Sequence, residues 1–499
     1  MSDNNQEKKP YDHDTIIIGA GISGINTAYR VQQELPNFSY AILEARGALG
    51  GTWDLFRYPG IRSDSDLFTF GFSWYPWTAS SQIVDGSAIR EYMREAAATH
   101  GIDKAIMYNH RVDTASWSSP DQLWTLDITH NGNKKTLRAR FLVFGTGYYD
   151  YHQPLSASIP GLTSFRGLTI HPQFWPEDCD YDGKRVVIIG SGATAITLLP
   201  KLSETAVKVT MLQRSPSYIM SIPSQTKRTW LTRLLPTSMF LKLNRVLKIV
   251  LSRLFFLFCR SFPTTARSVL RRRTLQQLPE GIPHDPHFKP RYNPWDQRLC
   301  ICPDGDFYKS LHTGRADIKT DTIKLITESG IQLGSGEFLD ADIIITATGL
   351  KLQIGAGIDI TIDQQPYKIP DKFLWHGILI EDLPNAALVI GYANISWTLG
   401  ADVTGRILCR LLKHMERGGF GAVIPRVQSG LTLQRRKLLN LSSTYVTEAE
   451  KDLPKVGDRG PWKARSNYLS DLIFAKYGKL NESLEFIRKS VCDIESDCT

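Results

Sequence analysis

The chain has 499 residues, of which 42% are hydrophobic and 22% charged, and its formal net charge is +9. This composition is typical of a soluble globular protein rather than a disordered or fibrous one, and the length favours two or three domains. The seven cysteines are scattered and odd in number, and Cys300 and Cys302 lack a second pair of ligands, so neither a disulfide framework nor a metal site is expected. The polar amino-terminal stretch resembles no secretory signal and indicates a reducing, cytoplasmic location.

The first predicted unit is a strand over 14–18, a G-x-G-x-x-G turn, a helix that reaches residue 34 and a strand over 40–44. Glycines in such a turn let the backbone approach a pyrophosphate, whose charge lies at the helix N-terminus. Glu44 stands twenty residues after the turn, where a carboxylate accepts hydrogen bonds from a ribose hydroxyl. We expect this unit to bind a dinucleotide and assign it FAD. The turn comprises Gly19, Gly21, Ser23 and Gly24.

Two longer patterns follow along the chain. The loop after the first unit fits G-G-x-W-x-x-x-x-Y-P-G-x-x-x-D at every defined position, and a later stretch fits F-x-G-x-x-x-H-x-x-x-W-P. The aromatic and proline residues of the later stretch also suit the packing of two domains against each other. The defined positions are Gly50, Gly51, Trp53, Tyr58, Pro59, Gly60 and Asp64 in the loop, and Phe165, Gly167, His171, Trp175 and Pro176 in the later stretch.

A second unit repeats the first, with a strand over 185–189, a glycine-rich turn, a helix and a strand over 207–212. No acid follows this second strand; Arg214 and Ser215 stand there. A carboxylate would repel a 2′-phosphate, whereas an arginine can clamp one with charge-assisted hydrogen bonds. We therefore assign NADPH to this unit, whose turn comprises Gly190, Ser191, Gly192, Thr194 and Ala195.

Residues 205–279 contain neither Asp nor Glu, and the apolar run 246–258 within them is interrupted by Lys248 and Arg253. That run is shorter than the roughly 20 residues of a membrane-spanning helix. Two interpretations stay open for the insert at about 222–290: a helical subdomain that covers the active site, or a peripheral contact with the inner face of the cell membrane. Nucleic acid is not expected, because the basic residues alternate with leucine and phenylalanine. The basic residues are Lys227, Arg228, Arg233, Lys242, Arg245, Lys248, Arg253, Arg260, Arg267 and Arg271 to Arg273.

The two longer patterns are similar to the signatures of the Baeyer–Villiger monooxygenases, flavoenzymes that insert one oxygen atom of O2 beside a ketone or onto a heteroatom. The segments 50–77, 292–300 and 391–398 resemble a bacterial subgroup that contains the ethionamide-activating monooxygenase and enzymes proposed to oxidise long-chain alkanes. The resemblance implies an α/β fold with two dinucleotide-binding, Rossmann-like domains and a helical insertion.

The domain boundaries follow from the same resemblance. Segments 141–147 and 343–349 are apolar strands that end in small residues, and they resemble the crossings between domains in two-dinucleotide flavoproteins. The expected order is the first part of an FAD domain (1–150), an NADPH domain (151–335), and the second part of the FAD domain with a carboxy-terminal segment (336–499).

The resemblance also implies residue roles. Arg298 occupies the position of the catalytic arginine beside the flavin, and Asp64 that of the aspartate which hydrogen-bonds it. Arg62 and Ser63 are expected near NADP, and His171 is assigned a conformational role. Residues expected near FAD are Ser23, Thr52, Trp53, Asp64 and Val112. One departure is Gln297, where many members of the family have a lysine that helps bind the 2′-phosphate.

The implied reaction begins with reduction of FAD by NADPH, after which O2 forms a C4a-peroxyflavin that converts an apolar ketone to an ester and can oxidise sulfides or thioamides. A permanently charged guanidinium suits this chemistry, because it stabilises anions without changing its protonation state. The alternative is a membrane-associated dehydrogenase that passes electrons from NAD(P)H through FAD to a quinone. Such an enzyme, like a flavin-binding redox sensor, would need neither the F-x-G-x-x-x-H-x-x-x-W-P stretch nor Arg298.

Overall fold

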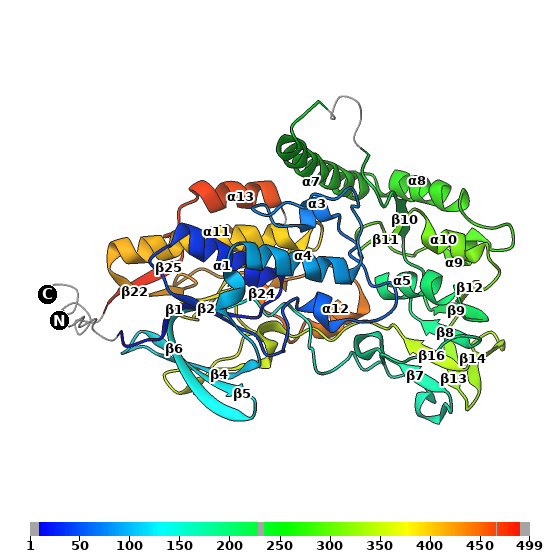
Figure 1. Cartoon of the computed structure of the whole chain (residues 1–499), viewed down its shortest axis with the longest axis horizontal. Helices are drawn as coiled ribbons and strands as arrows, with labels where there is room; N and C mark the ends of the chain where they lie inside the picture. The colour runs from blue at the N-terminus through cyan, green and yellow to red at the C-terminus, as the bar shows by residue number, and fades with distance from the viewer. Residues whose placement is uncertain (1–8, 228–233, 466, 490–499) are drawn as a thin grey trace.

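The computed structural model of the protein describes residues 9–227, 234–465 and 467–489, so that Arg228 and Arg233 lie outside the described residues. Two β-sheets with helices packed on them lie side by side along the long axis of the molecule (Figure 1). The predicted α/β class is confirmed.

The first sheet is built from two stretches of chain, 13–144 and 359–388. Its main order is β18-β17-β4-β5-β6-β1-β2-β3, and β1 pairs in parallel with both β2 and β6. The strands are β1 (His13–Ile18), β2 (Tyr40–Leu43), β3 (Ile106–Met107), β4 (His110–Ser118), β5 (Leu123–His130), β6 (Asn133–Phe144), β17 (Asp359–Ile362), β18 (Gln365–Pro366), β19 (Leu374–Trp375), β20 (Leu379–Ile380) and β21 (Ala386–Leu388).

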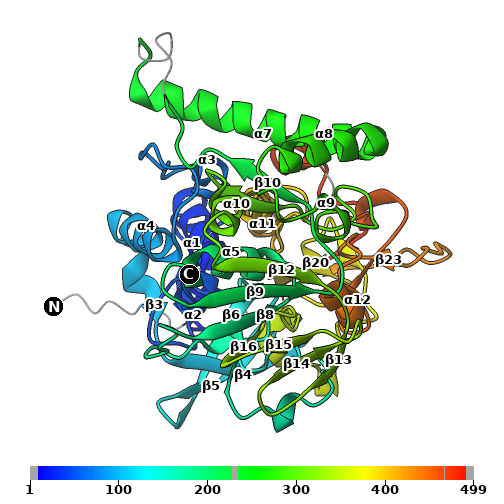
Figure 2. The ribbon, with the colours of Figure 1, turned by 90° about the vertical axis from the view of Figure 1, so that its right-hand side faces the viewer.

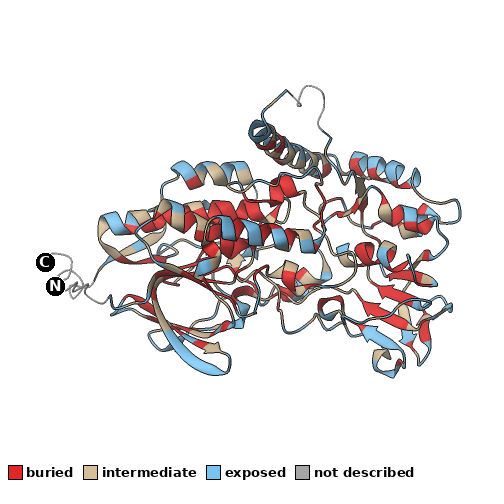
Figure 3. Cartoon of the chain, viewed as in Figure 1, coloured by how far each residue is buried: buried red, intermediate tan, exposed pale blue. Residues whose placement is uncertain are grey.

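Helices cover the parallel part of this sheet because both faces of such strands are apolar. Helix α1 (Ile22–Glu34) follows the glycine turn and packs on α11 (Trp397–Gly418). Helix α4 (Gly86–Thr99) lies beside them (Figure 1). Buried residues concentrate in the strands and in α1 and α11 (Figure 3).

The second sheet is parallel throughout and has the order β12-β9-β8-β16-β7. Helices α5 (Ala193–Leu202) and α10 (Asp306–Leu311) lie beside it, and a hairpin-like sheet of β13 (Ile323–Ile326), β14 (Gly330–Leu333) and β15 (Phe338–Asp340) follows β12 in the chain. The strands of the second sheet are β7 (Leu168–Ile170), β8 (Arg185–Ile189), β9 (Lys208–Gln213), β12 (Ala316–Thr320) and β16 (Ile343–Thr346).

Strand β16 changes one domain boundary. The expected return to the first domain at residue 336 precedes β16, which pairs with both β8 and β7 of the second sheet. Because backbone hydrogen bonds fix residues 343–346 inside that sheet, we place the return after residue 346.

The insert leaves the second domain after β10 (Ile219–Ile222) and rejoins it at β11 (Cys300–Pro303), which pairs with β10 in parallel. Between them the chain forms α7 (Thr237–Ser261), α8 (Pro263–Leu275) and α9 (His284–His287). Helices α7 and α8 lie along one edge of the molecule (Figure 2). No helix among the described residues is both long enough and apolar enough to cross a membrane.

Short elements complete the fold. The carboxy-terminal part contains α13 (Tyr468–Tyr477), which packs on α11. Helix α2 (Thr52–Leu55) lies within the loop 50–64, α3 (Leu67–Phe70) follows that loop, and α12 (Thr444–Ala449) precedes α13. The remaining strands are β22 (Phe420–Pro425), β23 (Arg436–Lys437), β24 (Lys455–Val456) and β25 (Leu484–Arg488).

Candidate active site

A cavity of about 580 Å³ lies where the two nucleotide-binding units meet. Residues from both units line it, including the first glycine turn, the loop 50–65 and two residues of α5. Its volume is in the range of small-molecule and cofactor sites. Other lining residues are Glu44, Val112, Tyr148, Tyr149, Tyr151, Arg298, Gln353, Tyr392 and Trp397.

The first glycine turn forms a tight cradle at the carboxyl end of β1. Gly19 has φ +102°, and a Cβ atom there would lie 2.9 Å from the carbonyl oxygen of Gly145. A Cβ atom at Gly24 would lie 1.9 Å from the carbonyl oxygen of Gly19. Only glycine fits these positions, and α1 begins at Ile22 between them, so the geometry suits a pyrophosphate at the helix N-terminus.

Glu44 lies at the carboxyl end of β2 and is buried. Its two carboxylate oxygens accept hydrogen bonds from the backbone N–H groups of Ala20, at 2.8 Å, and Arg46, at 2.9 Å. Burial raises the pKa of Glu44, and these two amides oppose the shift. A carboxylate has about four lone-pair sites, so this one can still accept hydrogen bonds from a ribose.

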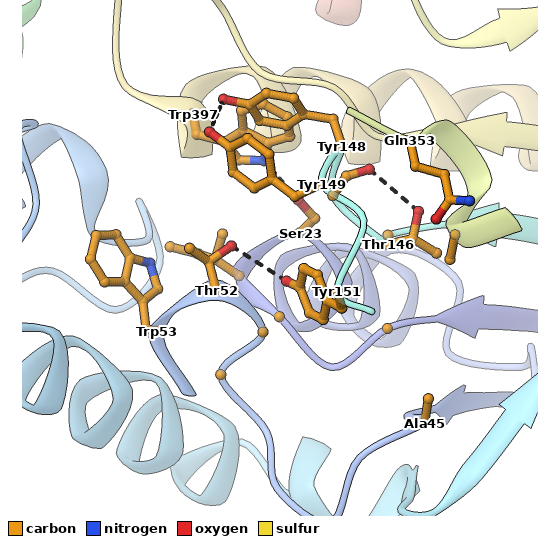
Figure 4. A pocket seen from close by; sticks show the side chains of 18 of the residues that line it. Ser23, Ala45, Thr52, Trp53, Thr146, Tyr148, Tyr149, Tyr151, Gln353 and Trp397 are labelled. Carbon is orange, nitrogen blue, oxygen red and sulfur yellow. Dashed lines mark hydrogen bonds between the residues drawn. The ribbon is translucent and has the colours of Figure 1, made fainter. Parts of the chain in front are cut away.

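Aromatic side chains form the opposite wall of the cavity (Figure 4). The ring of Tyr148 stacks on Trp397 with centroids 4.8 Å apart, and its hydroxyl lies 2.7 Å from that of Tyr149. Trp397 Nε1 donates a hydrogen bond to Ser23 Oγ at 2.8 Å, which ties this wall to the first glycine turn. Tyr148 and Tyr149 were not expected here from the sequence, although they directly follow the crossing segment 141–147, whereas Trp397 lies in the segment 391–398 that carries the resemblance.

The loop after β2 is fixed by one buried carboxylate. Asp54 accepts hydrogen bonds from Arg46 at 2.5 Å, Arg57 at 3.0 Å and Arg90 at 2.9 Å. Within this loop, Thr52 Oγ1 lies 3.4 Å from the hydroxyl of Tyr151 (Figure 4). Thr52 and the neighbouring Trp53 line the cavity, as does Val112 of β4.

Arg298 and Asp64 face the same cavity from different domains. Burial raises the pKa of Asp64 to about 6, against the opposing charges of Arg298 and Arg62. Desolvation by the surrounding protein acts to lower the pKa of Arg298, whose side chain is accessible from the cavity, but Tyr148, Tyr445 and Asp64 outweigh this effect and the pKa is raised. Among the described residues no salt bridge or hydrogen bond joins Arg298 to Asp64, so the expected direct hydrogen bond is replaced here by a longer-range attraction between charges.

Arg62 and Ser63 have different surroundings. The guanidinium of Arg62 forms a salt bridge with Asp306, at the start of α10, and so connects the loop to the second domain. The hydroxyl of Ser63 is buried and donates to the carbonyl oxygen of Ser65 at 2.9 Å. Both residues line the cavity.

The second glycine turn repeats the geometry of the first. Gly190 has φ +141°, and a Cβ atom there would lie 2.3 Å from the carbonyl oxygen of Ala347. Gly192 caps α5, which contains Thr194, and Tyr58 of the first domain packs against the hydrophobic core of this second domain. Ser191 Oγ donates to the carbonyl oxygen of Ser215 at 2.8 Å. Ala195 is buried in the hydrophobic core of the second domain.

Arg214 follows β9 and is exposed. Among the described residues it makes no salt bridge and no hydrogen bond to a side chain or backbone group, so its guanidinium is available to an anionic ligand. It lies beside the second glycine turn, since Ser191 bonds to Ser215.

The F-x-G-x-x-x-H-x-x-x-W-P stretch supplies β7, the edge strand of the second sheet. Phe165 is buried, and a Cβ atom at Gly167 would lie 2.4 Å from the carbonyl oxygen of Asp342. His171 Nδ1 accepts from the N–H of Gln173 at 3.3 Å, so Nε2 donates to the carbonyl oxygen of Gly349, also at 3.3 Å. Trp175, which precedes Pro176, packs against the hydrophobic core of the second domain.

The chain matches the family model described as "Flavin-binding monooxygenase-like" over residues 13–391. It is 46% identical over 478 residues to the FAD-containing monooxygenase EthA of Mycolicibacterium smegmatis, covering 95% of this chain and 97% of that protein. It is 43% identical over 485 residues to the probable FAD-binding monooxygenase AlmA of Acinetobacter baylyi, covering 97% of each.

Solved structures share the fold. The crystal structure of OTEMO in complex with FAD and NADP matches with a TM-score of 0.72 at 20% identity, covering 96% of this chain and all of that one. Oxidized steroid monooxygenase bound to NADP matches with a TM-score of 0.73 at 19% identity, covering 95% of this chain and 99% of that one. The predicted cofactors, FAD and NADPH, agree with these comparisons. The chain therefore belongs to the flavin-binding monooxygenase-like family, and it is a flavin-dependent monooxygenase with the fold of the Baeyer–Villiger enzymes.

Proposed function

We propose that this protein uses NADPH, FAD and O2 to convert apolar ketones to esters, and that it also oxidises sulfides or thioamides. The observation that carries the proposal is that Arg298 and Asp64 face one cavity together with the first glycine turn. A dehydrogenase that passes electrons to a quinone has no need of a guanidinium at that position.

The residues of the cavity fit the two cofactors. The cradle of Gly19 and Gly24, with the carboxylate of Glu44, supports FAD binding in the first domain. The second glycine turn and the accessible Arg214 support NADPH binding in the second domain. Bound FAD would supply hydride acceptance from NADPH and the activation of O2.

The protein's own groups then bind and stabilise the reacting species. The guanidinium of Arg298 stays charged throughout and stabilises negative charge that develops on oxygen. The carboxylate of Asp64 stabilises the positive charge of Arg298 and attracts its guanidinium toward the cavity. Tyr148 and Trp397 offer apolar ring faces, which favour an apolar ketone over a polar one and exclude water.

The test is product analysis with 18O2. Purified holoenzyme is incubated with NADPH and an aliphatic ketone, and the products are identified by mass spectrometry. The proposal expects an ester that contains one labelled oxygen atom, with one NADPH consumed per ester. NADPH consumption that yields no oxygenated product but rapidly reduces a quinone would overturn the proposal in favour of the dehydrogenase.

The location of this activity is also proposed. We infer that the enzyme works in the cytoplasm, and the basic and apolar residues of the insert 222–290 favour a peripheral contact with the inner face of the cell membrane.

A further inference from the structure

Helix α7 turns its apolar side outward. Arg245 Nη1 donates to the carbonyl oxygens of Phe68 and Gly71, each at 2.7 Å, and Lys248 Nζ donates to Gln82 at 2.5 Å. These basic side chains therefore point toward the first domain, the reverse of an ordinary surface helix. Eight apolar side chains of α7 are between 38% and 58% exposed: Met239, Leu243, Val246, Leu247, Val250, Leu251, Leu254 and Leu257.

Helix α13 extends this apolar surface. Leu469, Ile473 and Tyr477 recur at every fourth position, share one side of the helix and are 45%, 63% and 79% exposed. The two helices share one hydrophobic cluster, because Tyr468 of α13 packs against the cluster that contains Ile249 of α7. Figure 1 shows both helices on the same side of the molecule. An apolar surface formed by two helices marks an interaction site rather than ordinary solvent contact.

Basic side chains border the surface. Helix α8 lies along the same edge as α7 (Figure 2) and carries the exposed Arg271, Arg272 and Arg273. Lys242 of α7 and Lys476 of α13 are also exposed, and residues 205–279 contain no acidic residue. A two-fold contact between copies of this chain would bring like charges together, so the complementary partner is anionic.

We propose that α7, α8 and α13 form a docking surface for an anionic lipid bilayer. The apolar side chains of α7 and α13 enter the boundary between headgroups and acyl chains, and the arginines of α8 contact the headgroups. This surface also lies close to the cavity, because Ile249 belongs to the same hydrophobic cluster as Tyr392, which lines the cavity. A ketone dissolved in the bilayer would then reach the cavity over a short distance. This delivery of substrate rests on the proposed function, whereas the docking to the bilayer does not.

The test is flotation of the holoenzyme with vesicles of phosphatidylcholine alone and with vesicles that also contain phosphatidylglycerol. We expect binding to the anionic vesicles that weakens with salt. Reversing the charge of Arg271, Arg272 and Arg273 to glutamate is expected to weaken binding on the order of a hundredfold. The pair Leu247→Gln and Leu254→Gln, which keeps helix propensity, is expected to weaken it at least about tenfold.

The matched control is Leu325→Gln, because Leu325 is 46% exposed on β13, far from α7 in Figure 1. It is expected to bind as the unmodified protein does. Absence of binding to anionic vesicles would overturn the proposal, as would a concentration-dependent dimer that the Leu247→Gln, Leu254→Gln variant abolishes. Oxygenation of a water-soluble ketone, measured without vesicles, separates failure of the docking from failure of the proposed function.

Discussion

Arg260 Nη1 of α7 lies 2.6 Å from Asp296 Oδ1, and this salt bridge connects the insert to the loop that carries Arg298. The same loop packs on α7 through Trp295, whose ring centroid is 5.5 Å from that of Phe256. On its other side, Ser442 N donates to the carbonyl oxygen of Asp296 at 2.9 Å. The position of the Arg298 guanidinium therefore depends on a helix of the insert.

The first prediction concerns Arg260 as a positioning residue. Arg260→Gln is expected to lower kcat about tenfold, because small displacements of a catalytic group are costly, while Arg260→Lys restores most of it. The pair is partly exposed, so its loss is expected to cost about 1 kcal/mol or less and to shift Tm by at most about 3 °C. Steady-state kinetics and thermal melts at equal flavin content measure both effects.

A matched control for Arg260 is Arg166→Gln, which breaks the exposed Arg166–Glu328 salt bridge in the second domain. It is expected to leave kcat unchanged. Equal losses of kcat in the two variants would show that the Arg260 pair has no special role.

The second prediction concerns Arg298. Arg298→Ala is expected to slow product formation by about two to three decades, the usual cost of removing a preorganised donor at a site of developing charge. Reduction of the flavin by NADPH is expected to change little, because the proposed role begins after that step. Rapid-mixing measurements of flavin reduction, beside product yield, separate the two. Arg291→Ala, in the same loop, is the control. If Arg298→Ala slowed flavin reduction as much as product formation, the assignment would be contradicted.

The third prediction is a pH dependence that originates at Asp64. Because its pKa is raised to about 6, Asp64 is ionised at neutral pH and becomes protonated as the pH falls through 6. The rate of oxygenation is expected to fall in that range, and Asp64→Asn is expected to lower the rate and to remove this acid limb. Asp113 also lines the cavity, but its pKa is lowered, chiefly by Thr129, so Asp113→Asn is expected to keep the limb.

The fourth prediction concerns coenzyme choice. Arg214→Ser is expected to raise KM for NADPH about tenfold, the lower end of a charge-assisted hydrogen bond, and to leave KM for NADH unchanged. Lys184→Ser is the control, because Lys184 is exposed at the opposite, amino end of the second sheet. Equal KM changes for both coenzymes would remove the proposed contact with the 2′-phosphate.

Local patterns predicted the strands and glycine turns well. The strand expected over 185–189 is β8 itself, and that over 207–212 is β9 moved by one residue. These elements follow from short-range features: apolar runs that end in glycines. The aromatic wall could not be predicted in this way, because the contact of Trp397 with Ser23 joins residues that are 374 positions apart. Nor does helical periodicity reveal which side of α7 points inward, since that depends on carbonyl groups of residues 68 and 71.

The final prediction concerns His171, which follows β7 and whose Nε2 connects it to Gly349 in the segment after β16, while its Nδ1 bonds locally to Gln173. Because Nδ1 accepts and Nε2 donates, the ring is neutral, and burial lowers its pKa. A lowered pKa in the folded state means that the unfolded chain binds the proton more readily. Stability is therefore lost as the pH falls below the unfolded value of about 6.5.

His171→Asn is expected to destabilise the protein by about 1 kcal/mol at neutral pH and to reduce the loss of Tm between pH 7 and pH 5. If the histidine also sets the relative position of the domains, the variant consumes more NADPH per product, with the excess recovered as hydrogen peroxide. His312→Asn is the control, because His312 is exposed and its Nε2 donates only to the carbonyl oxygen of Gln277, at the surface. A lowered Tm with unchanged coupling of NADPH to product would restrict His171 to a structural role, because only domain position connects it to the cavity.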